Sequence, residues 1–237
     1  MQFSIILLTL AMYGLAGYMW YRERTANYLI ALAAGQIGTL FAPLWQWVYR
    51  FAYSPTFAPL FTLFGQDMPR VVFLGGWLTV LPALVIFFFY RARWWFPGYL
   101  TGVLTFVLFV VYHLMVEAIG VRLRLWSYDE TFALPFGLRA SIIAALMSGL
   151  VSLGTLSLLL LTRRYALTSL LTILLPTPLV LSLFVHGLFG APLYAALFLQ
   201  SRDMASGWAT TIGAVGTLGL VLWGAHTVAS VIDEQHS

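Results

Sequence analysis

The sequence has no cysteine and no lysine, and it has few charged residues of any kind. Without cysteine, the chain has no means of forming disulfide bonds or of ligating iron–sulfur clusters through thiolates. Without lysine it cannot hold retinal as a Schiff base, which excludes a rhodopsin-type photoreceptor. Only 8% of its 237 residues are charged and 61% are hydrophobic, whereas about a quarter of the residues in a soluble protein are charged. This composition predicts a polytopic membrane protein.

The motifs of several common enzyme classes are also missing. The sequence contains no Walker loop, no HExxH, no Gly-x-Ser-x-Gly and no paired DxxxD. Nucleotide hydrolysis, zinc proteolysis, serine hydrolysis and magnesium-dependent prenyl transfer therefore lack their machinery, and no metal site is predicted. The net charge of +4 comes from scattered arginines rather than from a continuous basic patch. No nucleic-acid partner is expected for such a surface.

Seven apolar runs are long enough to cross roughly 30 Å of hydrocarbon, which takes about 20 helical residues. They lie near 2–20, 28–48, 71–90, 96–118, 138–162, 166–187 and 206–230. An eighth apolar stretch, 188–200, is too short to cross alone, so it should extend a kinked sixth helix, re-enter or lie on the surface. The whole chain, 1–237, is predicted to be one all-α domain, a membrane bundle of about seven transmembrane helices.

Arginine placement predicts how the bundle is oriented. Arginine pairs follow the first, third and fifth spans in short connections, at positions 22 and 24, 91 and 93, and 163 and 164. Short cytoplasmic loops are enriched in basic residues. The longer connections hold the other six arginines, at 50, 70, 122, 124, 139 and 202, so the prediction depends on loop compactness as much as on arginine count. We expect the N-terminus outside and the C-terminus inside, in the cell (inner) membrane. The first span has no basic residues before it and no small-residue cleavage site, so it should remain uncleaved.

Loops and small residues carry further structural signals. Loops 49–70 and 119–137 contain the apolar pieces FAYSPTFAPLFTLF and TFALPFG, which should lie at the membrane surface as caps over a site or as plain connectors. Small residues let helix backbones approach closely and predict tight packing inside the bundle or against a partner helix. They occur in the fifth span as Ser148, Gly149, Ser152 and Gly154, and in the last as Gly213, Gly216 and Gly219.

The few ionisable residues inside the spans need an explanation, because each costs about 2.5–3.5 kcal/mol or more when unpaired. His113 and Glu117 lie one helical turn apart near the outer end of the fourth span, and His186 reaches a similar depth at the end of the sixth. We expect these three to form a catalytic cluster.

A lid that follows the fourth span should cover this cluster, with Trp126, Tyr128 and Asp129 as substrate-binding residues. A plainer interpretation also remains open. In that interpretation Glu117 lies at the membrane interface, reaches water and pairs with Arg122 or Arg124.

An acid near the end of a span, then a glycine, then Trp-x-Tyr form a local pattern made by Glu117, Gly120, Trp126 and Tyr128. This pattern resembles small seven-helix membrane enzymes of terpenoid metabolism, namely the carotenoid 1,2-hydratase and small lycopene-cyclase group and the related membrane terpene and spiroketal cyclases. The resemblance implies acid chemistry on a lipid-soluble isoprenoid, without metal or cofactor. Neutral Glu117 would protonate a double bond or epoxide, His113 would act as base, and aromatic rings would stabilise the cation.

Two other functions fit the same sequence. His113 and His186 could ligate a haem b between two spans, as in membrane cytochromes. Alternatively, the chain could be a non-catalytic subunit that holds pigments or membrane lipids between its helices, which suits its 16% aromatic residues. In that case Glu117→Gln would leave activity untouched, whereas Gly216→Leu would disrupt assembly.

Overall fold

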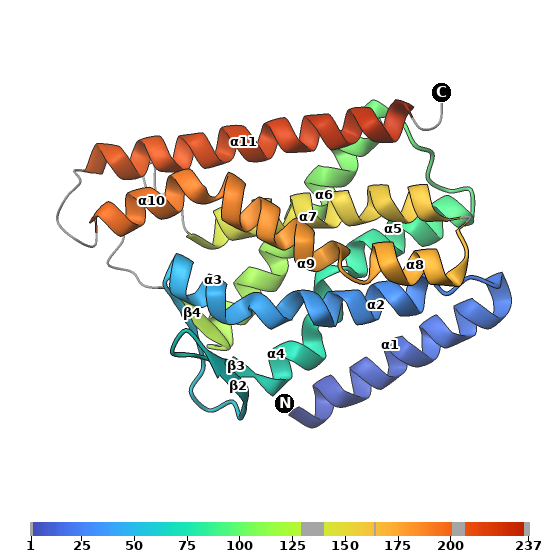
Figure 1. Ribbon diagram of the computed structural model, residues 1–237, viewed down its shortest axis with the longest axis horizontal. Coiled ribbons are helices and arrows are strands. Elements are labelled where there is room, and N and C mark those ends of the chain that lie inside the picture. The colour runs from blue at the N-terminus through green and yellow to red at the C-terminus, as the bar shows by residue number, and fades with distance from the viewer. Residues whose placement is uncertain (1, 129–139, 164, 201–206, 235–237) are drawn as a thin grey trace.

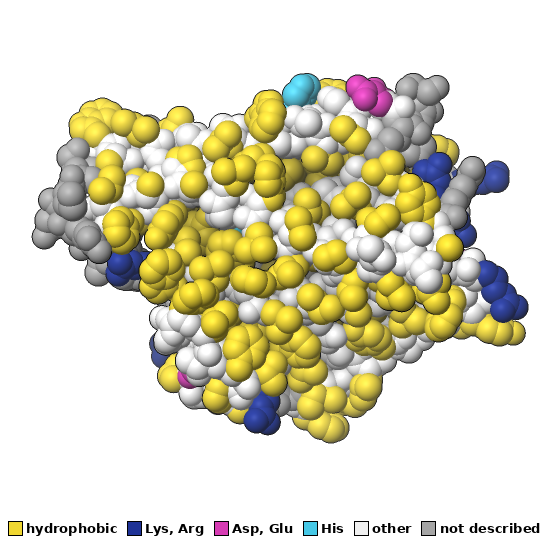
Figure 2. Space-filling view, in the orientation of Figure 1, with side chains coloured by type: hydrophobic (Ala, Val, Ile, Leu, Met, Phe, Trp, Pro, Cys, Tyr) yellow, Lys and Arg dark blue, Asp and Glu magenta, His cyan; other side chains and the backbone are white. Residues whose placement is uncertain are grey.

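The computed structural model describes residues 2–128, 140–163, 165–200 and 207–234. Within these residues, seven helices are long and apolar enough to cross a membrane. They are Phe3–Glu23, Asn27–Tyr49, Arg70–Arg91, Tyr99–Arg122, Ser141–Thr162, Leu167–Phe189 and Trp208–Glu234. Figure 1 shows them as a bundle of roughly aligned helices, and Figure 2 shows hydrophobic side chains over its flank. The predicted all-α membrane bundle of seven spans is confirmed.

Several spans are built from more than one helical segment. The first, fourth, fifth and seventh are the single helices α1 (Gln2–Glu23), α6 (Tyr99–Arg122), α7 (Ala140–Thr162) and α11 (Gly207–Glu234). The second joins α2 (Asn27–Gly38), η1 (Thr39–Phe41) and α3 (Ala42–Tyr49), and the third joins α4 (Arg70–Leu74), η2 (Gly75–Thr79) and α5 (Leu81–Arg91). The sixth joins α8 (Leu167–Leu174), α9 (Thr177–Ser182) and the π-helical turn η4 (Leu183–Phe189).

Proline explains where these spans break. Pro43, Pro82 and Pro178 each occupy the first turn of the segment that follows a break, in α3, α5 and α9. A proline is tolerated there because the first-turn N–H groups of a helix have no partner within the helix, whereas in a helix interior it removes a hydrogen bond. The helices therefore restart at these prolines.

The helix α7 lies at the centre of the bundle and is the most buried of the seven spans. Its small residues face other helices, as predicted. A side chain on Gly149 would meet Val110 of α6 at 2.8 Å, and one on Gly154 would meet Leu181 of α9 at 3.0 Å. These glycines therefore allow close helix contact inside the bundle.

The stretch 188–200 divides between two elements. Its first two residues end η4, and most of the rest forms a separate short helix, α10 (Ala191–Gln200), which packs along α11. Two of the glycines in α11 make this contact. Gly213 and Gly216 face Pro192 of α10, whereas Gly219 has no neighbouring atom within 4 Å. Two members of the predicted glycine face are thus used within the chain, and packing against a partner helix remains a prediction.

Two small antiparallel sheets lie at one end of the bundle (Figure 1), and the sequence analysis did not predict them. The strand β2 (Pro59–Leu63) pairs with β3 (Gln66–Pro69) through a two-residue turn. Phe64 and Gly65 have positive φ angles of 53° and 72°, as such hairpin turns require. The strand β1 (Phe51–Tyr53) pairs with β4 (Trp126–Tyr128). The loop after the second span (loop two) and the loop after the fourth span (loop four) therefore meet here. The piece TFALPFG and Asp129 lie outside the described residues.

The loops after the first, third and fifth spans meet at the opposite end of the bundle. Arg91 Nε lies 3.1 Å from Glu23 Oε2, which joins the first and third loops. The Arg163 guanidinium lies over the Tyr90 ring at 5.4 Å, which places the fifth loop beside them. The three arginine-bearing loops thus share one end, and its cytoplasmic location remains a prediction.

Candidate functional site

A cavity of about 460 Å³, which we call the inner cavity, lies within the bundle and reaches the sheet formed by β1 and β4. Most of its lining side chains are apolar. Five of the six predicted site residues line it, although they come from three separate segments of the chain. They are His113 and Glu117 on α6, Trp126 and Tyr128 on β4, and His186 on η4.

The Glu117 carboxyl group is held by two hydrogen-bond donors on β4. Trp126 Nε1 donates to Glu117 Oε2 at 2.9 Å, and Tyr128 Oη donates to the same oxygen at 2.8 Å. Alternate residues of a strand point to the same face, which brings both side chains to one oxygen. No ion pair joins Glu117 to Arg122 or Arg124 within the described part of the chain, so the predicted pairing is wrong, whereas the interfacial location of Glu117 remains a prediction.

Glu117 also lies deeper in its helix than predicted. The fourth span was expected to end at residue 118, but α6 continues to Arg122. Gly120 lies in this extra turn, and a side chain there would overlap the Trp126 indole. Gly120 thus makes the space from which Trp126 reaches Glu117.

Glu117 lines the inner cavity, and the two donors on β4 contact only one of its carboxyl oxygens. Oε1 has no hydrogen-bond partner among the described residues, and it is not one of the enclosed polar atoms. A proton on Oε1 would therefore face a bound molecule. After its transfer, the two donors on Oε2 would stabilise the remaining carboxylate, because hydrogen bonds to an ionised acceptor are the stronger ones.

The hydrogen-bond directions around His113 assign its protons. His113 Nε2 lies 2.9 Å from Ser152 Oγ, and Ser152 Oγ donates to the Thr79 carbonyl at 3.0 Å. Because a hydroxyl has a single hydrogen, Ser152 can only accept from the imidazole, so Nε2 carries the proton. Nδ1 of His113 is then the basic nitrogen.

His186 has the opposite arrangement. Its Nδ1 lies 3.2 Å from the Ser182 carbonyl, which can only accept, so Nε2 is the basic nitrogen. The π-helical turn carries this residue, and such turns occur often at functional sites. A haem shared with His113 through Nε2 would require His113 to give up Ser152.

Sequence reasoning missed two residues of the site, Trp45 and Tyr53. The Trp45 ring lies 5.4 Å from the His186 ring at an interplanar angle of 33°. Tyr53 lies opposite Trp126 in the β1–β4 pair, and their rings meet edge to face at 6.3 Å. Nothing in the piece FAYSP distinguishes this tyrosine, because its position depends on pairing with a distant strand.

The phenol groups of the sheet stay protonated. Burial raises the pKa of Tyr53, and the charge of Glu117 raises it further. Burial also raises the pKa of Tyr128 well above its usual value, with added contributions from the charge of Glu117 and the hydrogen bond to it. Tyr128 therefore remains a donor to Glu117 at any ordinary pH.

Comparison of the chain with protein-family models, with curated proteins and with solved structures finds no match. A function for this chain is therefore inferred from the geometry of the candidate site. That geometry consists of an apolar cavity in a seven-span membrane protein, one carboxyl group with an open oxygen, and two histidines with a basic nitrogen each.

Proposed function

We propose that this membrane protein is an enzyme that protonates an isoprenoid or carotenoid polyene and so cyclises or hydrates it, without metal or cofactor, in the cell (inner) membrane. The observation that carries the proposal is the Glu117 carboxyl group, which lines an apolar cavity and is held through Oε2 by Trp126 and Tyr128, with no partner for Oε1 among the described residues. An acid in such surroundings is suited to protonating a substrate that offers no charge of its own.

The reaction balances with water as the single further reagent, and only for hydration. The proton on Glu117 Oε1 adds to one carbon of a double bond and leaves a tertiary carbocation on the other. Capture by water gives an alcohol, and attack by an internal double bond gives a ring and a new cation. In either case a proton is then lost to a base such as His113 Nδ1 or His186 Nε2, and its return regenerates Glu117. Hydration adds one water, whereas cyclisation gives an isomer.

The cavity wall also suits a carbocation. The rings of Trp45, Tyr53 and Trp126 line the cavity around the acid and the histidines. Aromatic faces attract cations by about 0.5–2 kcal/mol each, most when water is excluded. The apolar remainder of the wall favours a hydrocarbon chain.

The test is turnover by the Glu117→Gln variant, which keeps the shape of the side chain and removes its proton. The purified protein is incubated with an acyclic carotenoid such as lycopene in deuterium oxide, and products are identified by mass spectrometry. Turnover should fall by roughly 10²–10⁴-fold, the usual contribution of a general acid. Glu23→Gln serves as the matched control at the opposite end of the bundle. Full turnover by Glu117→Gln would refute the acid role.

A non-catalytic pigment-holding or lipid-holding subunit is the second candidate, because an apolar cavity can hold a carotenoid without changing it. In that case the protein purified from its native membrane shows a three-peaked carotenoid spectrum, and the pigment comes off unaltered from both wild type and Glu117→Gln. A dithionite-sensitive Soret band in the same spectrum would instead indicate haem b held by His113 and His186.

A further inference from the structure

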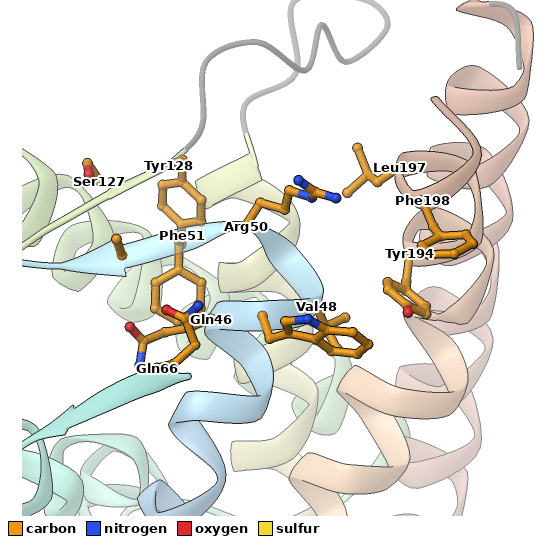
Figure 3. A pocket seen from close by; sticks show the side chains of 12 residues that line it. Gln46, Val48, Arg50, Phe51, Gln66, Ser127, Tyr128, Tyr194, Leu197 and Phe198 are labelled. Carbon is orange, nitrogen blue, oxygen red and sulfur yellow. The ribbon is translucent and has the colours of Figure 1, made fainter. Parts of the chain in front are cut away.

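A second hollow, which we call the vestibule, opens beside the inner cavity at the strand end of the bundle (Figure 3). It measures about 690 Å³ and is walled by α3, β1, β3, β4 and α10. Phe51, Tyr128 and Leu197 line both hollows. These three side chains therefore form the partition between the vestibule and the apolar interior.

The vestibule is rich in neutral polar groups. Gln46, Gln66, Ser127 and Tyr194 line it with amides and hydroxyls. Gln46 is only 4% exposed, and its Nε2 donates to the Asp67 carbonyl at 2.9 Å, which fixes the amide. A hydrocarbon would exclude water from those donors and acceptors that lack a protein partner, at a cost of about 1–3 kcal/mol for each. The vestibule therefore fits a polar group.

Arg50 gives the vestibule its charge. It ends α3 in the left-handed conformation, with φ 50° and ψ 49°, and its side chain extends across the vestibule toward Leu197 (Figure 3). Among the described residues that line the vestibule, Arg50 is the single ionised one, and none is Asp or Glu. A guanidinium has five N–H donors, so it can bind a phosphate in a bidentate manner alongside its other contacts.

We propose that the vestibule binds the phosphate head of an isoprenoid amphiphile whose chain occupies the inner cavity. The isoprenoid nature of the chain rests on the proposed function, whereas the phosphate site follows from the residues of the vestibule. Tyr128 lines the vestibule and also donates to Glu117. A head bound here would place a chosen double bond of a phosphorylated chain beside the acid, whereas a hydrocarbon such as lycopene would occupy the inner cavity alone.

Direct binding tests this proposal without turnover. Phytanyl phosphate is a saturated isoprenoid, so it cannot be protonated at carbon. Calorimetric titration of the full chain in neutral detergent should show it binding at least ~10-fold more tightly than phytanol or inorganic phosphate, because head and chain each contribute. Arg50→Asn should weaken its binding about 10-fold, whereas Arg50→Lys should retain most of it.

Matched controls separate charge loss from misfolding. Asparagine tolerates the left-handed backbone at position 50. Arg93 is a second exposed arginine with a positive φ, 61°, at the other end of the bundle, so Arg93→Asn should bind phytanyl phosphate normally. Each variant is compared with wild type by thermal unfolding.

Equal affinity for phytanyl phosphate and phytanol would overturn the proposed phosphate site. Normal binding of phytanyl phosphate by a folded Arg50→Asn variant would do the same. Tighter binding of phosphatidylglycerol than of phytanyl phosphate would overturn the isoprenoid chain and indicate a phospholipid. If Arg50-dependent binding holds while Glu117→Gln turns over lycopene normally, the head site stands and the proposed function fails. If turnover of lycopene depends on Glu117 but phytanyl phosphate does not bind, the proposed function stands and the head site fails.

Discussion

At the scale of single residues, the unusual feature is a carboxyl group inside a membrane span that has two neutral hydrogen-bond donors and, among the described residues, no paired cation. A salt bridge would stabilise a permanent carboxylate. The indole of Trp126 and the phenol of Tyr128 instead contact one oxygen and leave the other open. This arrangement suits an acid that must alternate between its neutral and charged forms.

Removal of either donor should slow the reaction. We expect Tyr128→Phe and Trp126→Phe to lower kcat on lycopene by roughly 10- to 100-fold each, because a hydrogen bond to a charged group contributes about 1.5–3 kcal/mol. Tyr18→Phe, on the lipid-facing side of α1, should have no effect. Initial rates under saturating substrate measure the difference. Normal rates in both β4 variants would show that the carboxylate needs no such stabilisation.

The sequence predicted the members of the site better than their roles. His113, Glu117 and His186 were identified because ionisable residues in apolar runs are rare. Trp126 and Tyr128 were expected to contact substrate, yet the structure gives them a hydrogen bond to Glu117 as well. That contact depends on strand alternation in β4, which three residues in a loop do not reveal.

At the scale of elements, the pairing of β1 with β4 positions the acid. These strands come from loops two and four and are three residues each. Length and hydropathy sufficed to predict the seven spans, because a membrane span has a required length. Such short strands carry no comparable signal, and their pairing is non-local.

Gly120 leaves the space in which the Trp126 indole of this sheet packs against α6. A larger residue at position 120 should push the sheet away from the helix. Gly120→Ala should lower the free energy of unfolding by about 1–3 kcal/mol, the usual cost of overpacking, and should reduce turnover by displacing Trp126 from Glu117. Thermal unfolding in detergent and tryptophan fluorescence measure both effects.

Gly219→Ala is the matched control, because Gly219 lies inside α11 with open space around it. It should be neutral or stabilising by up to about 1 kcal/mol, as alanine favours the helix over glycine. Equal behaviour of the two variants would show that Trp126 does not need the space at Gly120.

At the scale of the whole molecule, the bundle has two unlike ends. One end carries the joined arginine-bearing loops, with Arg91 paired to Glu23. The other carries the sheets, the vestibule and the acid. The candidate site thus lies at the end of the bundle opposite to the loops that carry Arg91 and Arg163.

The predicted orientation, with the N-terminus outside, is directly testable because the chain has no cysteine. A membrane-impermeant maleimide added to intact cells should label Thr56→Cys, in the strand-bearing loop two, and should not label Tyr165→Cys, after the fifth span. Inverted vesicles should give the reverse pattern, and the unmodified protein sets the background. Labelling of Tyr165→Cys in intact cells would reverse the assigned topology.

The short sequence distance between Glu117 and its donors bears on how the protein is made. Trp126 and Tyr128 follow Glu117 by 9 and 11 residues, and β1 precedes all three. During translation, the carboxyl group and all of its partners are therefore synthesised before the fifth span. Ser152, which holds His113, and His186 are synthesised later. Because chains fold from the N-terminus during synthesis, the nascent chain assembles the acid before the bases.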